Sequence, residues 1–122
     1  MKQYYFISGL PRSGSTLLSA IIKQNPEFYA DVSSPLPLIT KSVTDAISVH
    51  ESSSNTLKDQ RKNIFHGIFN AYYKHIEKPV IFDTSRTWTK NTSFLKEVFP
   101  YTKIICLVRD IVSILNSFEI IF

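Results

Sequence analysis

The chain has 122 residues, of which 43% are hydrophobic and 20% charged, a balance that fits one globular domain and argues against an intrinsically disordered protein. Its formal net charge of +4 suits a protein that binds a small anion, and the lack of any Lys/Arg cluster interleaved with aromatic residues argues against nucleic acid as a partner. A single cysteine, no cysteine/histidine group at metal-ligand spacing, and no apolar stretch of signal-peptide or membrane-span length predict a cytoplasmic protein without a disulfide or a metal ion.

The first elements in chain order are a strand and a helix separated by a short glycine-containing turn. Aromatic and β-branched residues predict a strand over 4–8 that ends at Gly9. Apolar residues recur at helical spacing over 16–25, and Pro26 ends this pattern. Turn-forming residues then predict a loop over 27–37.

Two longer helices are expected in the middle of the chain, over 38–49 and from an N-cap at Thr56 to about Ile76. The apolar stripe expected on the first helix comprises Leu38, Ile39, Val43, Ala46 and Ile47. The stripe expected on the second comprises Ile64, Ile68, Phe69, Tyr72 and Tyr73.

The second half of the chain alternates strands with helices. Strands are predicted over 80–82 and 103–108, with a helix over 91–99 between them and Asp110 capping a helix from Ile111 onward. Cys106 is expected to be buried inside the later strand. Continuous apolar strands between helices predict an α/β fold, a parallel sheet covered by helices on both faces.

The residues at the end of the chain, 118–122, are mostly apolar, whereas a free terminus is normally polar and solvated. We therefore expect residues 1–122 to form one domain that is truncated at its C-terminus.

The turn between the first strand and the first helix carries the strongest functional pattern. It reads Gly9-Leu10-Pro11-Arg12-Ser13-Gly14-Ser15-Thr16, and backbone N–H groups at such a strand–turn–helix junction form an anion-binding nest. Its two glycines have the spacing of a nucleoside-triphosphatase phosphate loop, but serine stands where that loop requires lysine. The cationic residue, Arg12, lies inside the loop instead. The alternative is that the segment is an ordinary turn that caps a helix. The residues predicted to bind the anion are Pro11, Arg12, Ser13, Gly14, Ser15, Thr16 and Leu17.

A second anion site is predicted where the strand over 103–108 ends. Arg109 follows this strand at the edge where open α/β sheets bind ligands, and Ser117 lies eight positions further on, along the next helix. The alternative is a surface arginine paired with Asp110.

The segment over 6–18 resembles the 5′-phosphosulfate loop of sulfotransferases that use 3′-phosphoadenosine 5′-phosphosulfate (PAPS). It is most similar to the branch that includes the tyrosylprotein sulfotransferases and many bacterial and phage-borne relatives. The resemblance implies that this loop wraps the sulfonate and the 5′-phosphate, and that Arg12 assists departure of the sulfonate from its phosphate. It also implies that Arg109 and Ser117 bind the 3′-phosphate. The resemblance extends over 4–119, the first half or so of a typical member of the family.

The catalytic groups are only partly assigned. Arg86, after the strand over 80–82, is predicted to contact the sulfonate or the acceptor, with stacking on Trp88 as the alternative. Tyrosylprotein sulfotransferases carry a catalytic lysine near here, and this sequence has none between Pro79 and Trp88. The general base is unassigned, because the loop offers only Asp31, which is more typical of a turn cap, and the three histidines fall on predicted helices.

These patterns together predict a P-loop-type sulfotransferase that transfers a sulfonate group from PAPS to an acceptor hydroxyl or amine, with no metal. A P-loop nucleotide kinase-like enzyme and a non-catalytic donor-binding fragment are the alternatives. The sequence leaves the acceptor and the oligomeric state open.

Overall fold

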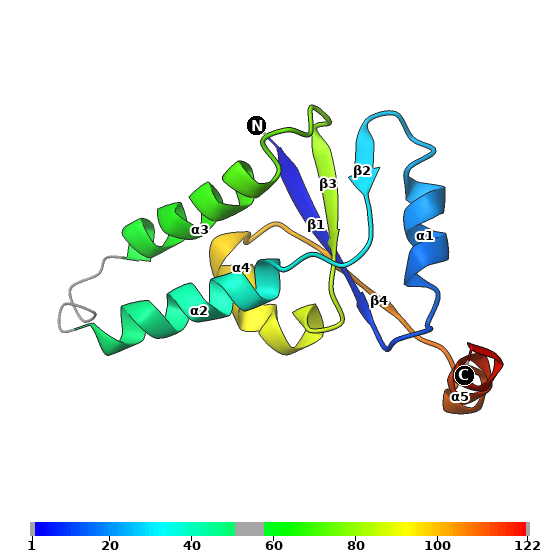
Figure 1. Cartoon of the computed structure of the whole chain (residues 1–122). Coiled ribbons are helices and arrows are strands. Elements are labelled where there is room, and N and C mark those ends of the chain that lie inside the picture. Colours follow the sequence, from blue (N-terminus) through cyan, green and yellow to red (C-terminus); the bar gives the residue numbers. More distant parts are fainter. Residues whose placement is uncertain (1, 51–57, 122) are drawn as a thin grey trace.

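The computed structural model describes residues 2–50 and 58–121, and these form one open α/β sheet with helices around it (Figure 1). The four strands of the described residues are all parallel, in the order β2-β3-β1-β4. Their bounds are β1 Gln3–Gly9, β2 Phe28–Ala30, β3 Val80–Thr84 and β4 Ile104–Leu107. The first strand is central, pairing with β3 on one side and β4 on the other, and this brings segments about 75 to 100 residues apart into register.

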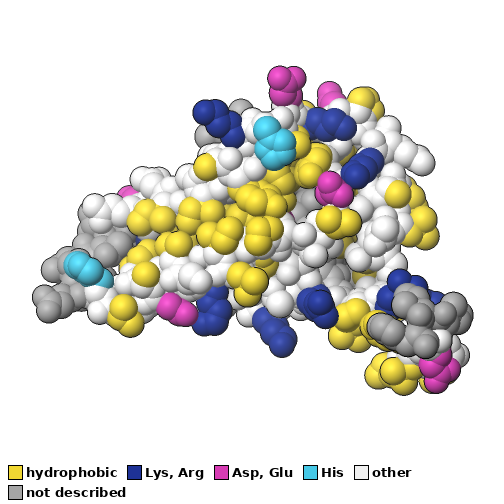
Figure 2. All heavy atoms as spheres, in the orientation of Figure 1, with side chains coloured by type: hydrophobic (Ala, Val, Ile, Leu, Met, Phe, Trp, Pro, Cys, Tyr) yellow, Lys and Arg dark blue, Asp and Glu magenta, His cyan; other side chains and the backbone are white. Residues whose placement is uncertain are grey.

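Helices cover the two faces of the sheet unequally. Their bounds are α1 Ser15–Ile22, α2 Leu36–Val49, α3 Lys58–Tyr72, a 3₁₀ turn Trp88–Asn91, α4 Thr92–Val98 and α5 Ile111–Ile121. The first helix packs against β1 and β2, whereas α3 and α4 pack together over the opposite face, and α5 lies beyond the end of β4 (Figure 1). Hydrophobic side chains also gather between α2 and α3 (Figure 2).

The main core is aromatic and lies on the α3/α4 face of the sheet. Phe6 has no exposed surface and contacts the Trp88 ring edge-on at 5.0 Å between centroids. Phe69 and Phe99 pack against the same ring of Phe6. Each such buried aromatic contributes about 1.5–3 kcal/mol by leaving water, so this cluster orients β1, α3 and the 3₁₀ turn relative to one another.

One carboxylate, that of Asp83, is buried next to this aromatic core. Asp83 accepts hydrogen bonds from the Trp88 indole, at 2.7 Å between Nε1 and Oδ1, and from the Tyr73 hydroxyl. Burial raises the pKa of Asp83 despite these donors. The carboxylate thus anchors the turn after β3, where Arg86 lies.

Most predicted elements are confirmed, with shifted ends. The strands over 4–8, 80–82 and 103–108 correspond to β1, β3 and β4. The first helix ends at Ile22, three residues earlier than predicted, and α5 begins at Ile111 as expected. The Asp110 carboxylate caps α5, accepting from the Ser113 N–H at 2.8 Å. The predicted cap at Thr56 lies outside the described residues.

Two expectations were wrong, and a third was right only in part, for tertiary reasons. The expected loop over 27–37 contains β2, a three-residue strand that forms only because β3 offers it an edge, and also the first residues of α2. Cys106 is exposed instead of buried, because β4 is the outer strand of the described sheet.

The third expectation, the apolar stripes of the two long helices, is confirmed only in part. On α2 the predicted Val43 packs against the core, but the buried residues are Leu36, Pro37 and Thr40, and the predicted Leu38 is 72% exposed. Of the second stripe, Phe69 on α3 and Tyr73 just after it are buried, whereas Ile64 is 42% exposed. Helical spacing shows that a helix has an apolar side, but the neighbouring elements decide which side is covered.

Candidate functional site

Three turns meet at the carboxyl edge of the sheet, since the carboxyl ends of parallel strands lie at one edge. They follow β1, β3 and β4, and each carries one of the predicted arginines. In chain order these are Arg12, Arg86 and Arg109. Every arginine predicted to act on a ligand therefore comes from this edge.

The β1–α1 loop, residues 9–14, is tightly wound. A Cβ added at Gly9 would lie 2.8 Å from the Ser13 Oγ and 2.9 Å from the Leu107 carbonyl oxygen, so only glycine fits there. Gly14 has φ 106° and is the N-cap of α1, a backbone conformation that other residues adopt at a cost. Arg12 also has a positive φ, 64°, which sets the direction of its side chain.

The amino end of α1 is open to a ligand. Its N-cap makes no side-chain hydrogen bond, and its first turn carries no acidic residue. The N–H groups of this turn are therefore not capped by side chains, and together with the helix dipole they favour an anion.

Arg12, Arg109 and Ser117 form one cluster beside this helix end. The Arg12 Nε donates to the Ser117 Oγ at 2.8 Å, and the Arg109 Nη1 donates to the Arg12 carbonyl at 2.9 Å. A cavity of about 270 Å³ lies between them and α1. Its lining consists of Arg12, Gly14, Ser15, Thr16, Leu17, Arg109 and Ser117. The fold thus brings together seven of the predicted site residues, although the two groups of them lie about 100 positions apart.

The remaining predicted residues lie on other sides of the loop. Pro11 and Arg86 line a separate cavity of about 220 Å³, and Ser13 lines neither cavity. The Ser13 hydroxyl is buried beneath the loop and has no hydrogen-bond partner among the described residues. Trp88 is fully buried and bonds Asp83, so it is not a surface platform for Arg86.

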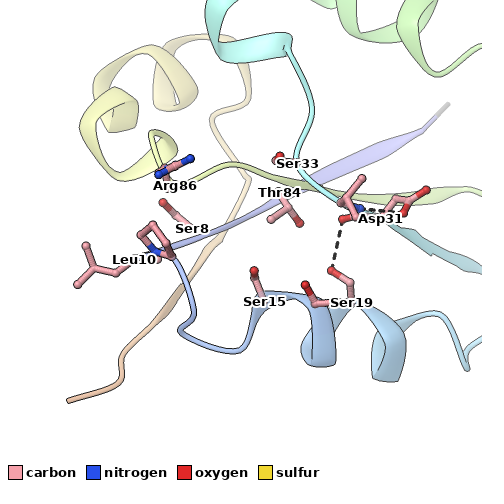
Figure 3. A pocket seen from close by; sticks show the side chains of 12 residues that line it. Ser8, Leu10, Ser15, Ser19, Asp31, Ser33, Thr84 and Arg86 are labelled. Atoms are coloured by element: carbon pink, nitrogen blue, oxygen red, sulfur yellow. Dashed lines mark hydrogen bonds between the residues drawn. The ribbon is translucent and has the colours of Figure 1, made fainter. Parts of the chain in front are cut away.

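This second cavity lies between the β1–α1 loop and the segment after β2, and most of the residues that line it have polar side chains (Figure 3). Ser8, Ser15 and Thr84 are directed into it, with Arg86 on the side opposite Asp31 (Figure 3). The Thr84 hydroxyl is buried and, within the described part of the chain, unpaired. A buried hydroxyl without a partner costs free energy, and a ligand in this cavity would supply the missing partner.

Asp31 is the carboxylate of this second cavity. The Val32 N–H donates to its Oδ1 at 2.8 Å, the Tyr29 hydroxyl donates to its Oδ2 at 3.2 Å, and the Lys23 ammonium lies 3.6 Å away. The Val32 N–H, followed by the charge of Lys23, holds the pKa of Asp31 below its ordinary value, so the group is ionised at neutral pH. Asp31 therefore caps a turn, as expected, and also faces the cavity.

Sequence reasoning predicted two of the hydroxyl residues that line the second cavity, Ser15 and Thr16, but missed others, above all Ser8 and Thr84. Both lie in the last two residues of a parallel strand, and that position is itself a signal for ligand-facing side chains. The histidines do not reach either cavity: the His66 Nε2 bonds the Val98 carbonyl at 2.6 Å, at the other end of the sheet.

Over residues 2–50 and 58–121, no three His, Cys, Asp or Glu side chains are grouped so as to hold a metal ion. In the same part of the chain, no helix combines the length and the apolar character that a membrane crossing requires.

An open parallel sheet with a glycine-containing turn after its central strand, and with arginines after neighbouring strands, is typical of α/β proteins that bind ligands at the carboxyl edge of the sheet. The model of the sulfotransferase family matches residues 5–122, and the chain belongs to that family. Its members transfer sulfonate groups. A search of curated proteins found no match to the chain.

Proposed function

We propose that this chain binds PAPS at the carboxyl edge of its sheet and transfers the sulfonate group to a hydroxyl or amine of an acceptor. The observation that supports this most is the cluster of Arg12, Arg109 and Ser117 around one cavity at the amino end of α1. A donor with phosphate groups at both its 5′ and 3′ positions requires two anion sites, and this cluster offers them side by side.

The β1–α1 loop would hold the 5′-phosphosulfate. The uncapped N–H groups at the start of α1 and the hydroxyls of Ser15 and Thr16 are donors for its oxygens. The guanidinium of Arg12 would neutralise negative charge on the oxygen between phosphorus and sulfur as the bond to sulfur breaks. Ser13 would support the loop from below, because its hydroxyl is buried under Gly9.

Arg109 and Ser117 would hold the 3′-phosphate. The Ser117 hydroxyl accepts from Arg12, so its own proton stays available for a phosphate oxygen. Arg109 donates one N–H to the Arg12 carbonyl, and the other four of its five N–H donors remain available. The same contact ties the two anion sites together, so that occupancy of one affects the position of the other.

The acceptor would approach through the second cavity, which Pro11 and Arg86 line. In the transfer step the acceptor oxygen or nitrogen bonds to sulfur, and the bond between sulfur and the 5′-phosphate oxygen breaks. The electron pair of that bond leaves with 3′-phosphoadenosine 5′-phosphate, and the proton of the acceptor passes to water. Arg86 would stabilise the negative charge on the sulfonate oxygens during the transfer. Asp31 is the carboxylate of this cavity, but its lowered pKa makes it a better hydrogen-bond acceptor for the acceptor group than a strong base.

The two alternatives differ from this function in testable ways. A nucleotide kinase would need a lysine at the β/γ-phosphates, and neither cavity contains a lysine among its lining residues. A chain that only binds the donor would retain the first cavity and its affinity but transfer nothing.

The first experiment is a calorimetric titration of the 122-residue chain with 3′-phosphoadenosine 5′-phosphate (PAP), in parallel with ATP. We expect saturable binding of PAP in preference to ATP, and a loss of affinity of at least about tenfold in Arg109→Ala, because a charge-assisted phosphate contact is removed. Arg86→Ala is the matched arginine control: it should keep its affinity for PAP, since PAP lacks the sulfonate and Arg86 does not line the cavity of Arg12, Arg109 and Ser117. A preference for ATP, or equal losses in the two variants, would reject the donor assignment.

A further inference from the structure

A second binding region lies at the amino edge of the sheet, opposite the site described above. A cavity of about 320 Å³ opens between the start of β1, one side of α3 and the turn before β4. The residues that give it its character are Lys2, Tyr4, Lys62, Asn70, Phe99 and Tyr101. Because β1 spans seven residues between the two edges, about 20 Å of strand separates this cavity from the β1–α1 loop.

Aromatic rings form much of the lining of this amino-edge cavity. The rings of Tyr4 and Phe99 are almost fully buried and lie 5.3 Å apart between centroids, so they form a fixed apolar floor. Tyr101 stands at the rim with 94% of its surface exposed, in contact with solvent instead of the core. A flat apolar group entering here would gain contacts with all three rings.

The polar groups of the cavity are nearly all donors. Lys62 is half-buried and forms no ion pair with any residue that the structure describes, whereas Arg61 beside it in the sequence pairs with Glu97 at 2.8 Å. The Lys2 ammonium donates to the Tyr73 carbonyl at 2.6 Å and has two further protons to offer. The Asn70 Oδ1 accepts from the Tyr4 hydroxyl at 2.7 Å, and this contact leaves the NH₂ group of Asn70 as a donor.

No negative charge balances these cations within the cavity. Its lining includes no Asp or Glu, and burial raises the pKa of Tyr4 to about 12, so that hydroxyl stays neutral at pH 7. The His66 ring also belongs to the lining, and its Nε2 is engaged by the Val98 carbonyl. Partial burial of an ammonium group without a counterion costs free energy, and an anionic ligand would remove that cost.

We propose that the amino-edge cavity binds a small aromatic anion, a flat ring that carries one carboxylate. The ring packs between Phe99 and Tyr101, and the carboxylate meets the Lys62 ammonium and the Asn70 amide. The proposal does not depend on the donor site, since the two regions share no lining residue.

The test is a calorimetric titration of the full 122-residue chain with 2-naphthoate, and with 2-naphthylmethanol as a neutral probe of the same shape. We expect naphthoate to bind about tenfold more tightly than the alcohol, and Lys62→Met to remove this difference. Lys96→Met is the matched control: Lys96 is exposed on the neighbouring helix α4 and does not line the cavity, so the tenfold preference should persist. Tyr101→Ala removes a side chain that supports no core contact, and it should weaken binding of both probes.

Amide chemical shifts locate the bound probe. Shifts at Asn70 and Thr102 support the proposal, whereas shifts confined to Gly14 and Thr16 would place the probe in the donor site and overturn it. Equal affinity for the two probes, or a preference that survives in Lys62→Met, overturns it as well. If Lys62→Met fails to fold, the Tyr101→Ala result and the shift map decide the question without it.

Discussion

The sharpest stability prediction concerns the three glycines, which should respond very differently to the same added methyl group. At Gly9 a Cβ would lie 2.8 Å from the Ser13 Oγ, 2.9 Å from the Leu107 carbonyl oxygen and 3.1 Å from the Leu107 Cβ. At Gly14 and Gly67 a Cβ would meet nothing within 4 Å. Alanine at Gly9 must therefore push β4 away from β1 or displace the loop.

The expected magnitudes follow from these surroundings. Overpacking against a backbone oxygen, added to the positive φ of 157°, should destabilise Gly9→Ala by about 2–4 kcal/mol. Gly14→Ala carries only the backbone cost of φ 106°, about 1–2 kcal/mol. Gly67→Ala lies within α3 at an exposed position, and it should stabilise the chain by about 0.5–1 kcal/mol.

Urea unfolding followed by tryptophan fluorescence measures these differences, because Trp88 is the one tryptophan and is fully buried in the folded chain. The urea midpoints should fall in the order Gly67→Ala, wild type, Gly14→Ala, Gly9→Ala. Equal destabilisation of the two loop variants would mean that β4 does not pack against Gly9 as described.

Two further predictions test the site and the buried carboxylate. Ser117→Ala should weaken PAP binding about tenfold in a calorimetric titration, because a hydroxyl beside Arg12 is lost. Ser113→Ala on the same helix should stay within about twofold, since its hydroxyl bonds Asp110, and similar losses in both variants would contradict the assignment. Burial raises the pKa of Asp83 above 3.8, so the folded chain keeps a proton at a pH at which the unfolded chain has lost it. The free energy of unfolding should therefore fall as the pH rises from about 4 toward the folded pKa. Asp83→Asn should flatten this slope in urea titrations across that range, and an unchanged slope would assign the pH dependence to another group.

Two segments that are distant in the sequence line one cavity together. Arg109 reaches from the turn after β4 to the backbone of Arg12, and Arg12 reaches on to Ser117 of α5. Each contact joins the β1–α1 loop to the β4–α5 segment. A substitution at Arg109 should therefore disturb the position of Arg12 as well as remove a charge, and kinetic effects of the two arginines should not be additive.

Several features of this protein follow from the sequence alone, because they depend on neighbours along the chain. The glycines, Arg12 and the hydroxyl residues between an aromatic strand and an apolar helix indicate the β1–α1 loop. The spacing of Asp110 before Ile111 predicts the cap of α5, which the structure confirms. In such local features the backbone hydrogen bonds and the residue that satisfies them lie within a few positions of each other.

Other features were decided only by tertiary structure. The three-residue strand β2 has too few residues to be recognised by itself and forms because β3 presents an unpaired edge. Cys106 is exposed because β4 is the outer strand, although its apolar sequence is typical of a buried one. The second cavity unites Ser8, Thr84 and Asp31 from three strands or strand ends. Parallel pairing sets which strand ends meet, and this pairing joins residues about 75 positions apart, beyond the reach of any local pattern.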